Sequence, residues 1–150
     1  MGVANIRVTT AVPPERFIQA LTDFGDRRSE LFGNSEGGYL KVHDRGDTWA
    51  DVTEGSGVVG GIWQRYRYDW SEPGVVRLEV LDSNSFGKGS SWEYRATPEP
   101  GGGSAIALTI HRRPTTLKGR VLDLLLTLTR NRFVRRDLEK TVARLEGQRG

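Results

Sequence analysis

Two kinds of hydrophobic spacing divide this chain. Up to about residue 112, apolar and polar residues alternate in short runs separated by glycine-rich turns, which is typical of antiparallel β-strands. Beyond residue 113, apolar residues recur at about 3.6-residue spacing, which predicts one long amphipathic helix from Pro114 to about Leu145. Its apolar stripe consists of Leu117, Val121, Leu124, Leu125, Leu128, Leu138, Val142 and Leu145. We therefore predict a curved sheet that one C-terminal helix closes.

Seven segments carry the strand pattern. The last six follow one another through short connections such as Glu72-Pro73-Gly74, so they predict an antiparallel meander. Between the first strand and the second, residues 13–25 and 27–32 predict two short helices. The predicted fold class is α+β, in the order β-α-α-β6-α. The predicted strands cover 4–11, 39–43, 48–54, 62–70, 75–82, 90–97 and 104–112.

The alternation assigns the bulky residues to one face of the sheet. In the segment 62–70, Tyr66 and Tyr68 lie opposite Arg65 and Arg67, and the following strands repeat this division. Charged residues on the second face can pair across strands. We therefore expect the bulky face to be turned toward the C-terminal helix.

The bulky face combines apolar walls with polar tips, which is what a site for an amphipathic molecule requires. Tyrosine and tryptophan each supply contact area and one polar group. Ordinary core packing explains any single ring slightly better than ligand contact does, so the prediction concerns the group. The predicted ligand-binding residues are Gln64, Tyr66, Tyr68, Val76, Leu78, Trp92, Tyr94, Leu108, Ile110, Val121 and Leu125.

Candidate catalytic residues are few. His43 and His111 each lie at a strand end, and neither belongs to a Ser/His/Asp pattern or a metal-ligand spacing. In an enzyme, a pocket tyrosine would work with a buried carboxylate or arginine. Asp51, Glu54 and Arg112 are candidates, but strand parity does not place all three on the inner face. We therefore predict no particular catalytic residue, no metal site and no cofactor.

The totals allow a single domain over residues 1–150. With 36% hydrophobic residues, a chain of this length can form one core. The absence of cysteine excludes disulfides and thiolate chemistry. The opening MGVANIRVTT lacks the apolar core of a secretory signal, and 18 arginines against 4 lysines are typical of a GC-rich bacterial genome. We expect a soluble cytoplasmic protein.

Positive charge gathers toward the C-terminal end. Residues 111–150 hold eleven Lys/Arg against four Asp/Glu, whereas residues 1–110 hold eleven against fifteen. In the predicted helix, Leu122, Leu126 and Phe133 lie opposite the main stripe, beside several arginines. Such a strip is typical of an anionic-membrane contact or a dimer face, and the alternative is cover by the N-terminal helices or a scatter of surface leucines. Nucleic-acid binding is not expected, because the sheet half is acidic.

The order of elements resembles the helix-grip fold. The segments VPPERF at 12–17 and ALTDF at 20–24 resemble the opening of bacterial members of the START-like (SRPBCC) superfamily, and TWADVTEG at 48–55 is similar to their third strand. This superfamily includes Bet v 1-type proteins, START domains, and bacterial polyketide cyclase/dehydrase and lipid-transport relatives. The resemblance implies one START-like domain with a long cavity between the sheet and the closing helix.

Three functions follow from the resemblance and the charge pattern. The first is binding or transport of a small hydrophobic or amphipathic molecule, such as a lipid or a polyketide, in that cavity. The second is a polyketide cyclase/dehydrase-like enzyme. The third is peripheral association with an anionic membrane through the basic C-terminal helix. A monomer and a homodimer remain equally open.

Overall fold

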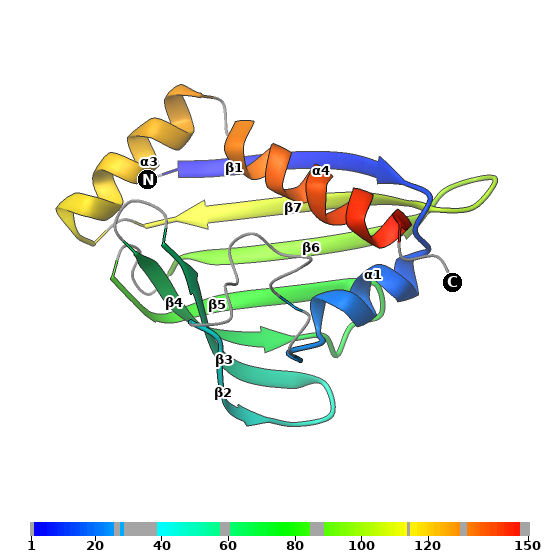
Figure 1. Cartoon of the computed structure of the whole chain (residues 1–150), viewed down its shortest axis with the longest axis horizontal. Coiled ribbons are helices and arrows are strands. Elements are labelled where there is room, and N and C mark those ends of the chain that lie inside the picture. The colour runs from blue at the N-terminus through cyan, green and yellow to red at the C-terminus, as the bar shows by residue number, and fades with distance from the viewer. Residues whose placement is uncertain are drawn as a thin grey trace.

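Seven antiparallel strands form one curved sheet, with α1 and α4 along one face of it and α3 at one end (Figure 1). The computed structural model describes residues 2–25, 28, 39–57, 61–84, 89–113, 115–129 and 132–147, with only the backbone of Gly2 and Phe133. The strand order β1-β7-β6-β5-β4-β3-β2 confirms the predicted meander, with the first strand added beside the last. The α+β helix-grip prediction is therefore confirmed. The predicted helix at 27–32 lies outside the described residues except for Arg28.

The strands have the bounds β1 Gly2–Thr10, β2 Lys41–Arg45, β3 Trp49–Ser56, β4 Ile62–Asp69, β5 Val75–Ser83, β6 Ser91–Pro98 and β7 Ser104–Arg112. The helices are α1 Pro14–Leu21, α3 Leu117–Leu128 and α4 Arg132–Gly147. At one edge of the sheet, every residue of β2 is exposed. At the other edge β1 pairs with β7 along its whole length, from Gly2 opposite Arg112 to Thr10 opposite Ser104.

The core lies between the inner face of the sheet and the helices α1 and α4. Alternation sets the face, because Tyr66 and Tyr68 of β4 are buried while Arg67 between them is exposed. Helix α1 begins with Pro14 in its first turn and packs against β6, burying Phe17. Helix α4 packs against β1.

The prediction of one continuous C-terminal helix is wrong, because the structure has two helices in that region, α3 and α4. Helix α3 ends at Leu128, and the Thr129 hydroxyl donates to the Leu125 carbonyl at 2.8 Å. The apolar stripe is interrupted at the same place, since position 135, where the stripe would continue, is an arginine that donates to the Arg7 carbonyl at 3.0 Å. No apolar side chain is therefore present at that position to hold a continuous helix against the sheet.

The two helices place their stripes differently. Leu138, Val142 and Leu145 of α4 are buried in the core. The stripe of α3 is exposed, so Val121 and Leu125, which the sequence assigned to the ligand-binding face, instead lie about half-exposed on α3. This corrects the prediction of their position. None of the described helices is long and apolar enough to cross a membrane.

Candidate functional site

Four aromatic side chains form a continuous cluster on the inner face of β4 and β6. The rings of Tyr66 and Tyr68 meet edge to face with their centroids 5.9 Å apart, and the Tyr66 ring lies 6.4 Å from Trp92. Trp92 stacks on Tyr94 at 6.5 Å. Such offset and edge contacts are favourable for aromatic quadrupoles. The sheet therefore presents a wall of rings toward the helices.

Two phenylalanines from the N-terminal part of the chain close one end of this wall. The Phe17 ring of α1 lies 6.0 Å from Tyr94, and the Phe24 ring meets Tyr68 edge to face at 4.9 Å. The wall and its helical cover are thus joined by aromatic contacts at that end.

The structure brings together nine of the eleven predicted ligand-binding residues on this inner face. All of them are buried except Trp92, which is partly buried against the core. Val121 and Leu125 are the two that lie elsewhere. The nine are Gln64, Tyr66, Tyr68, Val76, Leu78, Trp92, Tyr94, Leu108 and Ile110. Their role as ligand contacts remains a prediction.

Several polar groups on the inner face lack a partner among the described residues. The Gln64 side chain is 7% exposed, and its Oε1 atom accepts no hydrogen bond from them. The hydroxyls of Tyr66 and Tyr94 have no hydrogen bond to a described residue either, but of these three groups only Gln64 Oε1 is fully enclosed. A buried polar group without a partner costs stability, so its presence in a native fold calls for a reason.

Burial raises the pKa of three inner-face tyrosines. The pKa values of Tyr66, Tyr68 and Tyr94 all lie above the usual range, with burial as the largest cause and the negative charge of nearby Glu54 acting in the same direction. These phenols therefore keep their protons at neutral pH. Each can act as a hydrogen-bond donor there.

An alkaline titration should show this burial directly. Since the folded-state pKa of Tyr66, Tyr68 and Tyr94 is raised above the ordinary value of about 10, their contribution to stability is complete below that pH and is lost as the pH rises through the folded-state values. We expect their phenolate absorbance to develop only in the alkaline range where circular dichroism reports unfolding. Full ionisation of all tyrosines near their ordinary pKa in the folded protein would contradict this.

A buried polar network joins β3, β4 and the segment at residue 28. The Arg28 guanidinium donates from Nε to the Glu54 carboxylate, and from Nη2 to the Tyr68 hydroxyl at 2.8 Å. The Tyr68 hydroxyl in turn donates to the second oxygen of Glu54. Arg28 also donates from Nη1 to the carbonyls of Leu21 and Asp23 at 2.8 and 2.9 Å. The network therefore fixes the end of the N-terminal helical segment against the sheet.

The three candidate acid–base residues do not converge. Glu54 lies on the inner face within the network, whereas Asp51 lies on the outer face, where Arg65 binds its carboxylate at 2.7 and 2.8 Å. Hydrogen bonds from Arg65 lower the pKa of Asp51. Arg112 is buried and donates from Nε to Asp123 of α3 at 2.8 Å. Sequence reasoning missed Arg28, because its partners are 26 and 40 residues away and no local pattern marks it.

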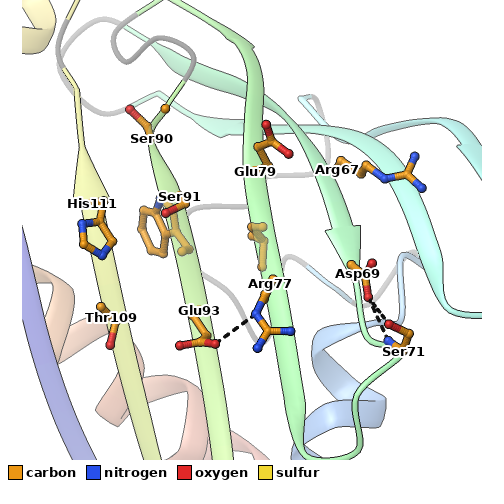
Figure 2. A pocket seen from close by; sticks show the side chains of 13 residues that line it. Arg67, Asp69, Ser71, Arg77, Glu79, Ser90, Ser91, Glu93, Thr109 and His111 are labelled. Carbon is orange, nitrogen blue, oxygen red and sulfur yellow. Dashed lines mark hydrogen bonds and ion pairs between the residues drawn. The ribbon is translucent and has the colours of Figure 1, made fainter.

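The outer face of the sheet carries a shallow polar depression of about 580 Å³ (Figure 2). Outward-pointing side chains of β4 to β7 line it, among them Arg67, Glu79, Thr109 and His111. His111 is exposed, and His43 lies on the exposed edge strand, bonded to Thr53 at 2.7 Å. The depression therefore differs from the predicted cavity in both face and chemistry.

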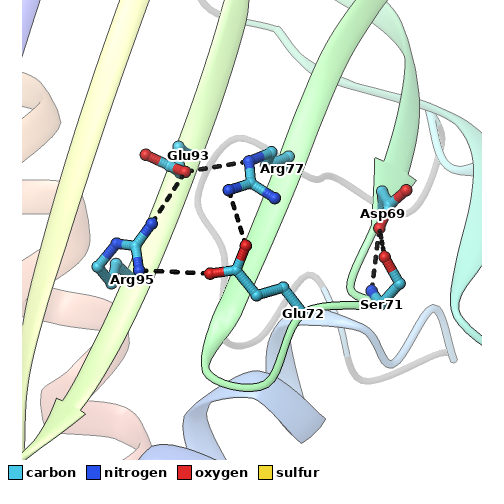
Figure 3. A network of polar contacts seen from close by, with 6 residues as sticks. All are labelled: Asp69, Ser71, Glu72, Arg77, Glu93 and Arg95. Atoms are coloured by element: carbon cyan, nitrogen blue, oxygen red, sulfur yellow. Dashed lines mark hydrogen bonds and ion pairs between the residues drawn. The ribbon is translucent and has the colours of Figure 1, made fainter.

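Charged side chains at this depression form ion pairs with one another (Figure 3). Arg77 contacts Glu72 at 3.0 Å and Glu93 at 3.1 Å, and Arg95 contacts the same two carboxylates at 3.4 and 3.5 Å. Solvent-exposed pairs of this kind contribute little net stability, because water and salt screen them. They tie the strands together on the outer face and leave the inner face as the stronger candidate site. Among the described residues, no group of three or more His, Cys, Asp or Glu side chains could hold a metal ion.

Comparison with known proteins gives similarity at the level of structure. No family model and no curated protein sequence matches the chain. Solved structures do match: TTHA0849 from Thermus thermophilus aligns over 99% of this chain and 100% of its own, with 17% identity and a TM-score of 0.78. The Zhui aromatase/cyclase from a Streptomyces species aligns over 97% and 93%, with 17% identity and a TM-score of 0.76.

A START superfamily protein from Mycobacterium smegmatis aligns over 95% of this chain and 98% of its own, with 12% identity and a TM-score of 0.72. At such identities the likeness concerns the fold. The alignments extend over nearly the whole of both chains, so the shared fold includes the sheet and the helices that cover it.

Proposed function

From the helix-grip fold that the chain shares with START-like and Bet v 1-like proteins, we propose that this protein binds a small amphipathic molecule of the lipid or polyketide kind. The whole chain acts as one ligand-binding domain, and the molecule lies between the inner face of the sheet and the helices. The aromatic wall of β4 and β6 provides its apolar contacts. Carrying or sensing the molecule requires no reaction.

The observation that carries this proposal is the set of polar groups on the aromatic wall that have no partner among the described residues. Tyr66 and Tyr94 supply hydroxyl donors, and Gln64 Oε1 supplies an acceptor. Leaving the enclosed Gln64 Oε1 atom unsatisfied costs about 1–3 kcal/mol. A ligand with a carbonyl or hydroxyl group recovers part of that cost while its apolar portion lies against the rings. The preferred ligand is therefore mainly apolar with at least one oxygen function.

The affinity follows from the size of such a molecule. Burying about 300 Å² of its apolar surface contributes roughly 7 kcal/mol before the cost of association is subtracted. Micromolar binding is therefore expected. Tyrosine hydroxyls that bond to the ligand add about 1 kcal/mol each.

Native mass spectrometry of the freshly purified protein tests for a co-purified molecule of this kind. Tyr66→Phe and Tyr94→Phe keep the rings and remove the hydroxyls, so each should weaken binding of the recovered molecule about fivefold. Thr109→Val is the matched control, because it removes one hydroxyl from the outer depression. Binding that responds to Thr109→Val and not to the tyrosine changes would place the ligand on the outer face and overturn the proposal.

A polyketide cyclase/dehydrase-like enzyme is the second candidate. It is favoured by the buried network, which sets the Glu54 carboxylate and the Tyr68 phenol in the same wall as the aromatic cluster. The Tyr68 hydroxyl is bonded on both sides, to Arg28 and to Glu54, and this occupation favours a structural role over proton transfer. Chromatography coupled to mass spectrometry separates the candidates, because a carrier returns an added ligand unchanged, a dehydrase lowers its mass by one water molecule, and a cyclase returns an isomer of equal mass and different retention.

A further inference from the structure

Helix α3 exposes a continuous apolar stripe. Its five side chains are all leucine or valine, and each is 48–79% exposed. At about 100° of rotation per residue, they fall within an arc of about 100° on the helix surface. They are Leu117, Val121, Leu124, Leu125 and Leu128. An exposed apolar patch of this kind on a single helix marks an interaction surface.

Contacts outside the stripe fix α3 to the end of the sheet, so the direction of the stripe is determined. Asp123 accepts a hydrogen bond at 2.8 Å from the buried guanidinium of Arg112 at the end of β7. Lys118 Nζ donates to the Gly61 carbonyl at 2.6 Å. The hydroxyl of Thr116 caps the helix by accepting from the Gly119 amide at 3.0 Å. These contacts hold α3 at the end of the sheet with its leucines outward.

The charge around the stripe is positive. Arg120 is exposed on α3 next to the stripe, and Arg132, Arg135 and Arg136 are exposed at the start of α4. The one acidic residue of α3, Asp123, is paired with Arg112. An apolar helix face bordered by arginines is complementary to a surface that is apolar inside and anionic outside.

We propose that α3 is a docking helix for an anionic lipid bilayer. Its stripe lies among the acyl chains just below the headgroups, while Arg120 and the arginines of α4 contact lipid phosphates. With twelve residues, α3 is about 18 Å long and lies parallel to the membrane, since spanning would take about 20 residues. A second copy of the chain fits less well, because pairing two stripes would bring two basic surroundings together.

The surface is tested by co-sedimentation with phosphatidylcholine vesicles that contain or lack phosphatidylglycerol. We expect binding to the phosphatidylglycerol vesicles that weakens as salt is added. The double variant Leu124→Glu/Leu128→Glu should weaken it about tenfold or more, because it places two carboxylates in the inserted face. Thr127→Glu is the matched control, since Thr127 is exposed on the same helix outside the stripe. Arg120→Glu should weaken binding to the anionic vesicles alone.

The proposal is overturned if the wild-type chain ignores both kinds of vesicle, or if Thr127→Glu weakens binding as much as the double variant. Equal binding with and without phosphatidylglycerol would remove the anionic requirement and overturn it too. Size-exclusion chromatography with light scattering tests the other occupant of the stripe, a second copy of this chain, by measuring the oligomeric state. A dimer that the double variant dissociates would assign the stripe to a second copy. Because phospholipids could also enter the inner-face site, Tyr66→Phe and Tyr94→Phe are sedimented in parallel. Binding that these two variants leave unchanged and that Leu124→Glu/Leu128→Glu weakens belongs to the stripe, whatever the outcome for the proposed ligand-binding function.

Discussion

Arg28→Met is expected to lower the free energy of unfolding by about 3–5 kcal/mol, the loss typical of removing one partner from a buried ion pair. The Arg28 side chain is 1% exposed and that of Glu54 is 4% exposed. The substitution removes the guanidinium that faces this carboxylate and the donor to the Tyr68 hydroxyl. The segment around residue 28 also loses its bonds to the Leu21 and Asp23 carbonyls. Urea unfolding followed by circular dichroism measures the change.

Arg65→Met is the matched control for this substitution. Arg65 forms a bidentate pair with Asp51 on the outer face, but its side chain is 41% exposed and the pair is screened by solvent, so its loss should cost far less than the loss of Arg28. The double variant Arg28→Met/Glu54→Met should recover stability relative to Arg28→Met alone, because no buried carboxylate then remains in the network. Equal losses for Arg28→Met and Arg65→Met would show that the network is not buried in solution.

Leu145→Ala and Leu124→Ala should differ sharply although both remove the same atoms from the same predicted stripe. Leu145 of α4 is 2% exposed within the core, so its truncation should cost about 2–5 kcal/mol. Leu124 of α3 is 58% exposed, and its truncation should change the free energy of unfolding by about 0.5 kcal/mol or less. Thermal and urea unfolding of the two variants measure the difference.

The difference between Leu145→Ala and Leu124→Ala also tests whether the C-terminal segment forms two helices or one. A single helix over the sheet, as periodicity alone predicts, would bury both leucines and make both substitutions costly. Similar large losses would therefore favour the continuous helix. A large loss confined to Leu145→Ala would support the break between α3 and α4.

The sheet and most of its inner face could be predicted from the sequence, because strand alternation is a strict physical constraint. A shift of one residue would turn Tyr66 and Tyr68 to solvent and bring Arg67 into the core, so only one assignment of faces is stable. The same parity places Gln64 and Tyr94 inward. Glycine and proline turns then fix where each strand ends.

Periodicity could not show that the C-terminal apolar stripe is exposed on one helix and buried on the next. A 3.6-residue pattern identifies which residues share one side of a helix, but it does not identify what that side contacts. The stripe of α3 and the stripe of α4 have the same spacing, yet one is exposed and the other is buried. One polar residue did indicate the end of the first stripe, because Arg135 occupies the position where the apolar stripe would continue.

The buried network could be predicted only in part. Parity places Glu54 on the inner face of β3 beside Val52, and it places Tyr68 on the inner face of β4. Arg28 comes from outside the sheet, so no parity rule applies to it. Its assignment needs the tertiary position of a segment 26 residues before Glu54.

The pairing of β1 with β7 affects the order in which the protein can form during synthesis. The Ser104 hydroxyl donates to the Val12 carbonyl at 2.6 Å across 92 residues of chain, and among the described strands β1 pairs with β7 alone. A ribosome must therefore release β7, whose Ser104 follows Val12 by 92 residues, before β1 can be incorporated. Until then α4 lacks β1, the strand against which it packs, and the nascent chain is open to chaperones and to self-association.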